Sequence, residues 1–292
     1  ALGVLAERAG LPPGILQIVP SNDASASGKE FCENPKVRKI TFTGSTRVGR
    51  ILLAQAAEQV KKCSMELGGN APFIVFNDAD LDEAVIGAMA CKFRNNGQTC
   101  VCANRIYVQS GVYGDFTARF IKAVEAMQVG DGFEGADLGP LISKPALAKV
   151  QEHIADALAK GAVVATGGKP HDLGGTFFQP TILTGVTQDM QVSQEETFGP
   201  MAPLFEFEDE DDVIAMANDT IFGLAAYFYA KDLSRVYKVA EALEYGIIGV
   251  NTGIISTEVA PFGGIKQSGL GREGSHHGMD EYLELKYICM SV

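Results

Sequence analysis

Short apolar runs alternate with longer amphipathic runs along nearly all of the 292-residue chain. The apolar runs have the length of buried strands, and glycine-containing turns separate many of them from runs with helical spacing. Residues 81–93 show helical spacing most clearly, because their apolar side chains recur every three or four positions behind a candidate cap at Asp80. This alternation predicts an α/β protein built on a parallel sheet.

The same patterns predict the individual elements. We expect helices at residues 2–9, 46–60, 81–93, 113–127, 145–160, 211–217 and 233–243. We expect strands at residues 15–19, 37–42, 63–67, 73–76, 105–109, 163–166, 178–182, 201–207, 224–230, 247–250 and 282–290. Residues 21–28 and 261–278 have the composition of loops, and the length of the chain is enough for two ordinary domains.

Charge and hydropathy exclude several classes of partner. The net charge of −12 argues against a surface for nucleic acid or anionic membranes. The sequence shows no apolar run near the ~20 residues that a membrane span needs, and no signal or transit sequence. We therefore expect no nucleic-acid partner, no membrane partner and a cytoplasmic location.

The six cysteines lack CxxC pairs and histidine-rich neighbours, so we expect no metal site. A chain without a secretory signal favours a reducing compartment. We interpret the histidines at 276–277 as surface residues. The plain interpretation of four cysteines is a small buried hydrophobic residue, at Cys32, Cys63, Cys91 and Cys289.

Cys100 is different, because it follows a flexible Gly97 and the polar pair Gln98 and Thr99. A thiol in such a turn is reachable and can ionise. Glu66 lies 34 positions upstream and is followed by Leu67 and two glycines. A thiol nucleophile and a carboxylate that activates water are a minimal set for covalent catalysis through a thioester. Taken singly, each has a plainer interpretation, as a loop cysteine and as a solvated glutamate after a strand.

Residues 44–49 invite a phosphate-binding interpretation. The spacing GxxxxG is followed by Arg50 and Ile51 instead of Lys and Ser or Thr, so it is not a P-loop, and the GxGxxG fingerprint is absent. A Gly-Ser-Thr helix start remains, and its free N–H groups favour an anion. From spacing alone, a plain helix cap is the alternative.

Five motifs, in order, resemble those of the NAD(P)-dependent aldehyde dehydrogenases. They are FTGST with Gly49 (42–49), MELGG (65–69), GQTC (97–100), EETFGP (195–200) and PFGGIKQSG (261–269). Together they span most of the chain. The sequence around Cys100 and the sequence of residues 271–287 are most similar to those of the succinate-semialdehyde dehydrogenase branch.

The resemblance implies an aldehyde dehydrogenase-like α/β fold. Residues 1–67 would be the remainder of a Rossmann-type cofactor domain, residues 68–252 the catalytic domain, and residues 253–292 a substrate-pocket loop, a return to the cofactor domain and an oligomerisation strand. Family members are much longer at the N-terminus, so we expect this chain to be a fragment. The family's assembly implies a homo-oligomer, a dimer or a tetramer.

The resemblance also implies roles for site residues. Cys100 would be the nucleophile and Glu66 the general base. The cofactor, NADP or NAD, would be held by Gly44, Ser45, Thr46, Gly49, Leu67, Glu196 and Phe198. Glu195 is the neighbour that could be confused with Glu196. The substrate would be bound by Arg94, Ser256 and Phe262.

The expected reaction oxidises succinate semialdehyde, a small-molecule aldehyde, to succinate. An arginine fork suits the far carboxylate of such a substrate, although Arg94 could instead form a structural ion pair. Glutarate semialdehyde, another ω-carboxylated aldehyde or an uncharged aldehyde are alternative substrates. A further alternative is a catalytically incomplete fragment that acts only as an assembly module. Cys102 is a candidate redox partner of Cys100 through a strained disulfide, or else a spectator thiol.

Overall fold

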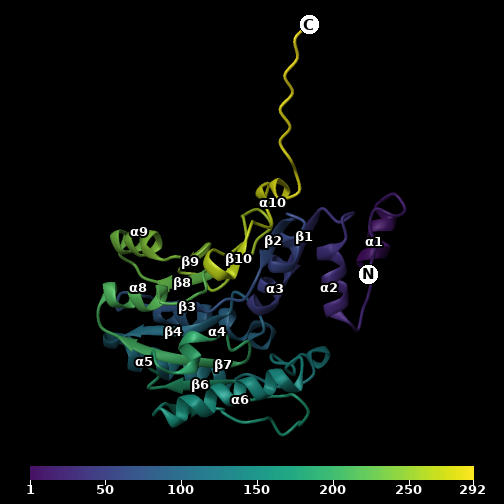
Figure 1. Ribbon diagram of the computed structural model, residues 1–292. Coiled ribbons are helices and arrows are strands. Elements are labelled where there is room, and N and C mark those ends of the chain that lie inside the picture. The colour runs from purple at the N-terminus through teal and green to yellow at the C-terminus, as the bar shows by residue number, and fades with distance from the viewer. The chain divides into compact units, whose positions relative to one another are not determined.

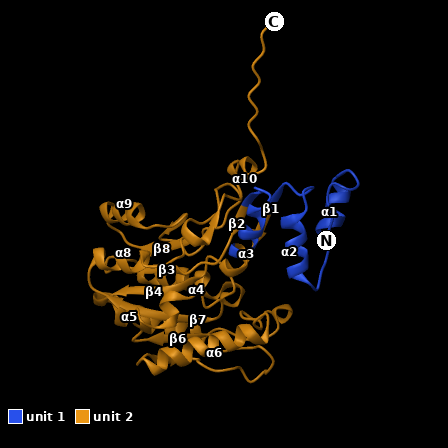
Figure 2. Ribbon diagram, in the orientation of Figure 1, with its two compact units in different colours: residues 1–40, 50–63 blue, residues 41–49, 64–292 orange.

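The computed structural model describes residues 1–292 and divides into two compact units. Unit 1 comprises residues 1–40 and 50–63, and unit 2 comprises residues 41–49 and 64–292 (Figure 2). The chain passes from one unit to the other within β1 (Lys39–Thr43), α3 (Thr46–Ala57) and β2 (Lys62–Glu66). The domain boundaries predicted at residues 67 and 252 divide the chain by function, into cofactor and catalytic domains. They stay a prediction.

Unit 1 contains α1 (Leu2–Arg8) and α2 (Ala24–Glu33). Asp23 caps α2 by accepting a hydrogen bond of 2.9 Å from the N–H of Ala26. Cys32 is buried, as predicted, and its Sγ lies 3.6 Å from the carbonyl oxygen of Leu52. The same prediction is wrong for Cys289, which is exposed, and Cys63 is only partly buried.

Two predictions for unit 1 are wrong. Residues 15–19 form turns and irregular backbone instead of a strand, with exposed apolar side chains and no neighbouring strand. Residues 21–28 are not a loop, because α2 begins at Ala24. Serine and glycine made this segment resemble a loop, whereas the Asp23 cap and the alanines favour a helix.

The largest sheet lies in unit 2 and has the strand order β5-β6-β7-β4-β3-β8-β9 (Figure 1). The strands are β3 (Ala71–Val75), β4 (Ala103–Gln109), β5 (Val163–Thr166), β6 (Thr181–Thr184), β7 (Met201–Phe207), β8 (Ala225–Tyr229) and β9 (Ile247–Val250). All neighbours are parallel except β5, which pairs antiparallel with β6 at the edge. The predicted parallel sheet is confirmed. Its strands read as continuous apolar runs because both faces are buried.

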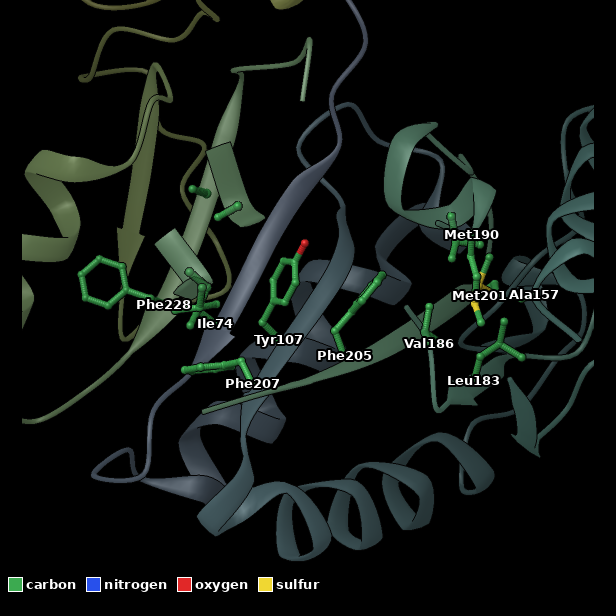
Figure 3. Packing of buried hydrophobic residues seen from close by; sticks show 14 of the residues in the cluster. Ile74, Tyr107, Ala157, Leu183, Val186, Met190, Met201, Phe205, Phe207 and Phe228 are labelled. Carbon is green, nitrogen blue, oxygen red and sulfur yellow. The ribbon is translucent and has the colours of Figure 1, made fainter. Parts of the chain in front are cut away.

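Helices cover both faces of this sheet. The helices are α4 (Leu81–Phe93), α5 (Ser110–Glu125), α6 (Lys144–Ala159), α7 (Gln191–Gln194), α8 (Glu210–Asn218) and α9 (Leu233–Ala242). Side chains of α4 and α5 share one buried cluster with Phe73 and Ile106. Side chains of α6, α8 and α9 share another with Ile74 and Tyr107, part of which is drawn in Figure 3. Consecutive strand residues therefore face opposite layers of helices.

A smaller sheet has the order β1-β2-β10. β10 (Gly269–Leu270) pairs antiparallel with β2, so that Gly269 lies opposite Glu66. It falls in the segment predicted as a glycine-rich loop, which also holds η3 (Lys266–Ser268) and leads into α10 (His277–Asp280). This pairing fixes the end of β2, where Glu66 is placed.

The strand predicted at residues 282–290 is not formed in this chain. Residues 283–292 belong to no helix or strand, and apolar side chains such as Leu285, Tyr287 and Ile288 are exposed. A strand is stabilised by the backbone of a neighbour, and this chain offers none there. None of the helices is long and apolar enough to cross a bilayer.

Candidate active site

A cavity of about 630 Å³ in unit 2 gathers residues that are far apart in the sequence. Its lining consists of Thr43, Gly44, Ser45, Glu66, Leu67, Gly68, Arg94, Gln98, Thr99, Cys100, Val101, Glu196, Phe198, Ser256 and Phe262. All predicted site residues are among them except Thr46, Gly49 and Cys102. Residues from all five motifs singled out in the sequence thus line one cavity.

The backbone before Cys100 makes a tight left-handed turn. α4 ends at Phe93, and φ is 51° at Asn95, 59° at Asn96 and 71° at Gly97. Asparagine and glycine tolerate this region better than other residues. At Gly97 space is also limiting, because a Cβ would lie 2.2 Å from the carbonyl oxygen of Gly199. The turn directs the following residues, 98–101, into the cavity.

Glu66 is the last residue of β2, and only 4% of its surface is exposed. Its Oε2 is buried without a hydrogen-bond partner. Burial raises the pKa of Glu66 to about 8, with help from the charge of Glu273 and against that of Arg272. A carboxyl group with this pKa can take up and release a proton near neutral pH.

Cys100 is half-buried, and its thiol does not ionise as readily as the sequence suggested. Burial raises its pKa to about 11, and the negative charges of Glu196 and Glu66 add to the shift. The nucleophilic thiolate is therefore scarce at neutral pH unless a base removes the proton. The neighbouring Thr99 Oγ1 is buried without a hydrogen-bond partner.

The structure distinguishes Glu196 from Glu195 by where their side chains lie. Glu196 lines the cavity, and its Oε1 accepts a hydrogen bond of 3.1 Å from the N–H of Gly69. Burial raises the pKa of Glu196 to about 7, although the Gly69 N–H and the charges of Lys149 and Lys92 oppose the shift. The side chain of Glu195 is instead largely exposed and lies 3.9 Å from Lys149 Nζ.

The start of α3 borders the cavity through Gly44 and Ser45. Ser45 Oγ accepts a long hydrogen bond of 3.4 Å from the N–H of Val48, so the helix-cap interpretation has support. Thr46 Oγ1 donates to the carbonyl oxygen of Gln267 at 3.1 Å. Gly49 lies behind the wall, where a Cβ would be 2.5 Å from the side chain of Leu67. Thr46 and Gly49 thus shape the cavity from outside.

Arg94, Ser256 and Phe262 line the same cavity, and Arg94 and Ser256 are exposed. The ion pairs of the chain do not include Arg94, so the structural alternative for this residue has no support. A free guanidinium and a hydroxyl group beside the thiol can receive a carboxylate.

Cys102 lies behind the cavity with 1% of its surface exposed. Its Sγ is 3.4 Å from Lys92 Nζ and 3.3 Å from the carbonyl oxygen of Lys92. Cys100 and Cys102 are not bonded to each other here. The redox role of Cys102 stays a prediction, and it would require this thiol to leave Lys92.

Several contributors were missed by sequence reasoning. The cavity is also lined by Gln98, Thr99 and Val101. They flank the predicted nucleophile in the sequence, and this position could have identified them as cavity residues. The charges of Arg272 and Glu273 act on Glu66 from a glycine-rich segment whose pattern gives no such signal.

The sequence model described as "Aldehyde dehydrogenase family" matches residues 1–288. The chain belongs to the aldehyde dehydrogenase family. It is 64% identical to the NADP(+)-dependent succinate-semialdehyde dehydrogenase GabD of Escherichia coli (strain K12), covering 100% of this chain and 61% of that protein. It is 62% identical to a glutarate-semialdehyde dehydrogenase of Pseudomonas aeruginosa, covering 99% and 60%.

A solved structure of this family is also similar. The crystal structure of an E. coli NADP-dependent enzyme superposes with a TM-score of 0.98 at 64% identity, covering 100% of this chain and 60% of that one. The α/β fold implied by the motifs is thereby confirmed. The chain spans about three-fifths of the length of the curated relatives it matches.

Proposed function

We propose that the full-length protein carrying this chain is an NADP- or NAD-dependent aldehyde dehydrogenase that oxidises succinate semialdehyde to succinate. The observation that carries the proposal is that Cys100, Glu66 and Arg94 open into one cavity. In these proposed roles, Cys100 would be the nucleophile, Glu66 the titratable carboxylate and Arg94 the cation for the far carboxylate, around one substrate volume.

In the first half of the reaction, Cys100 Sγ adds to the aldehyde carbon while a base accepts the thiol proton. Glu66, with a pKa of about 8, is the candidate for that base. The oxygen of the resulting thiohemiacetal is an anion, and the N–H of Cys100 is a candidate donor to it. A bound nicotinamide supplies the acceptor for the hydride that this carbon must lose. The acyl group then remains on Cys100 as a thioester.

Glu66 must first release the thiol proton to solvent. In the second half it then takes a proton from water, and the water oxygen attacks the thioester carbon. The C–S bond breaks, the carboxylic acid leaves, and the thiol of Cys100 is restored. The unpartnered Glu66 Oε2 supports this role, because it leaves an acceptor free for a water molecule.

The cavity also suits a nicotinamide dinucleotide. Gly68 leaves room for a carboxylate, since a Cβ there would be 2.9 Å from Glu196 Oε2. Glu196 can accept hydrogen bonds from two ribose hydroxyls, and the start of α3 offers N–H groups to the pyrophosphate. Leu67 and Phe198 would pack against the bound cofactor. The E. coli relative is named for NADP(+), and both NADP and NAD remain candidates.

The main competing substrate is glutarate semialdehyde, for which the P. aeruginosa relative is named. It has the same two functional groups with a longer spacer, so Arg94 and Ser256 would serve either compound. Phe262 contributes apolar surface to the same pocket.

We also propose a homo-oligomer, a dimer or a tetramer. The exposed apolar side chains of residues 283–292 would find a partner strand in a second copy. A monomer mass by light scattering would contradict this part of the proposal. The cytoplasmic location stays a prediction.

The test is formation of NADPH or NADH by the full-length protein. Succinate semialdehyde, glutarate semialdehyde and a neutral aldehyde of equal length are compared, each with NADP and with NAD. We expect the highest kcat/KM for succinate semialdehyde. Equal or reversed preference for the neutral aldehyde would overturn the substrate assignment. If the protein turns over none of these aldehydes, its assignment as an enzyme is wrong and an assembly role is favoured.

A further inference from the structure

One face of α6 supports the segment that carries Glu196 and Phe198. His153 contacts Thr197, Val150 lies behind Gly199, and Asp156 Oδ2 accepts a hydrogen bond of 2.8 Å from the N–H of Gln191. Positions 150, 153 and 156–157 follow one another on the same side of a helix. The packing at Gly199 is tight, because a Cβ there would be 2.4 Å from Val150 Cγ2.

The polar centre of this contact is the imidazole of His153. Its Nδ1 lies 3.1 Å from Thr197 Oγ1, and both residues have 1% of their surface exposed. Its Nε2 lies 3.5 Å from Glu195 Oε2. Because an ionised carboxylate only accepts, the arrangement favours the proton on Nε2. Nδ1 then accepts the hydrogen bond that the hydroxyl group of Thr197 donates.

The supported backbone is strained. Thr197 stands between two residues that line the cavity, and the next residue, Phe198, has a φ of 54°. A bulky residue is disfavoured in this left-handed region and keeps the conformation only where its surroundings impose it. Thr197 points toward α6, while Glu196 and Phe198 face the cavity.

We propose that His153 is a positioning residue whose hydrogen bond to Thr197 holds Glu196 and Phe198 in the orientation that receives the nicotinamide half of the cofactor. The inference rests on the proposed function, because that function assigns the cofactor to these two residues. His153 itself does not line the cavity, so it acts through Thr197.

Burial favours the neutral form of the ring more than the surrounding charges oppose it. Burial and Lys149 hold the pKa of His153 below its ordinary value, whereas Glu195 and Glu152 oppose this shift, and Asp156 lies on the same helix. Protonation in mild acid gives Nδ1 a hydrogen atom, so Thr197 must turn its hydroxyl group around to accept. Because the pKa of His153 is lowered, cofactor affinity should hold at about pH 6.5, the ordinary histidine pKa, and fall only at lower pH.

The first experiment measures NADP and NAD binding to the full-length protein by titration calorimetry, without aldehyde. His153→Leu and Thr197→Val should each weaken binding about tenfold, equivalent to about 1.4 kcal/mol. The double variant should weaken binding no further, because both changes remove one interaction. His153→Gln retains a donor and an acceptor and should restore most of the affinity. Gln151→Met is the control, because Gln151 lies on the exposed side of the same helix, away from Thr197.

The second experiment follows amide hydrogen exchange of residues 195–201, which needs neither cofactor nor turnover. His153→Leu should accelerate exchange there, while His153→Gln should not. Unchanged affinity and unchanged exchange in both His153→Leu and Thr197→Val would overturn the proposal. Wild-type protein that binds neither NADP nor NAD would instead contradict the proposed function, and the exchange result would still decide whether His153 orders the segment.

Discussion

Gly69 lies so close to Cys100 that a Cβ on residue 69 would be 2.2 Å from the carbonyl oxygen of Cys100. The φ of Gly69 is not in the left-handed region, so lack of space explains the glycine here. The N–H of Gly69 also donates to Glu196. Gly69 therefore contacts both the loop that carries Cys100 and the carboxylate of Glu196.

Gly69→Ala should displace the Cys100 backbone and lower kcat/KM by about 100-fold or more, since small misplacements of reacting groups are costly. Gly114→Ala is the matched control. Nothing lies within 4 Å of a Cβ at Gly114 in α5, so alanine should leave activity unchanged and stability equal or higher. Steady-state kinetics and thermal melting of both variants make the comparison. Wild-type kcat/KM in Gly69→Ala would contradict the close packing described.

The pH dependence should report Glu66. A base acts when deprotonated, so kcat should rise with pH and level off above about 8, the raised pKa of Glu66. Glu66→Gln should lower kcat by about 100-fold or more and remove this limb of the profile. Stopped-flow separation of hydride transfer from thioester hydrolysis shows which step carries the dependence. A wild-type profile that is flat between pH 6 and 9 would contradict the assignment.

Alkylation of Cys100 should depend on its carboxylate neighbours. At pH 8, Glu196→Gln removes a negative charge that raises the pKa of the thiol, so iodoacetamide should react several-fold faster. Glu195→Gln is the control, because that side chain points away from the cavity and should leave the rate unchanged. The rate is read from the peptide containing Cys100 by mass spectrometry. Equal rates in all three proteins would show that Glu196 does not act on the thiol.

Arg94 should select for the far carboxylate. Arg94→Leu should raise the KM for succinate semialdehyde by about 10- to 100-fold, the cost of losing a charge-assisted pair. The KM for a neutral aldehyde of equal length should stay the same or fall. Steady-state kinetics with both substrates decide this, and a parallel rise in both KM values would assign Arg94 a structural role.

Arg105 should be a stability residue. It is fully buried and donates to the carbonyl oxygens of Asn70, Met216 and Ala217 and to the hydroxyl groups of Tyr107 and Tyr245. Arg105→Met would remove these five hydrogen bonds and should lower the free energy of unfolding by about 3–5 kcal/mol. Urea denaturation measures this loss.

The control is Arg119→Met, which removes an exposed ion pair with Asp82 and should cost less than about 1 kcal/mol. Equal losses in the two variants would contradict the role of Arg105.

The sequence predicted most of the large sheet and its helices, because long periodic segments carry their own signal. β7 and β9 begin and end at the predicted residues, and Asp80 caps α4 as expected. The failures were short segments whose structure depends on a partner. Residues 15–19 and 282–290 are apolar enough for strands, yet no neighbouring strand is present in this chain.

The candidate site likewise has residues that the sequence identifies and contacts that it does not. Cys100, Glu66 and Glu196 could be selected because each stands in a distinctive local motif. The contact of His153 with Thr197 and the closeness of Gly69 to Cys100 arise from packing between distant segments, which local patterns do not encode. The high pKa of Cys100 was missed for the same reason, since burial and two distant carboxylates produce it.

The most direct test of the account is to trap the acyl-enzyme in the Glu66→Gln variant of the full-length protein. The variant is mixed with succinate semialdehyde and NADP, quenched in acid, digested and analysed by mass spectrometry. Because the variant also lacks the proposed base for Cys100, we expect one NADPH per site to form slowly. We expect a succinyl group to remain on the peptide containing Cys100, because thioester hydrolysis has lost its base. An acyl group on another cysteine, or continued wild-type turnover without any adduct, would contradict it.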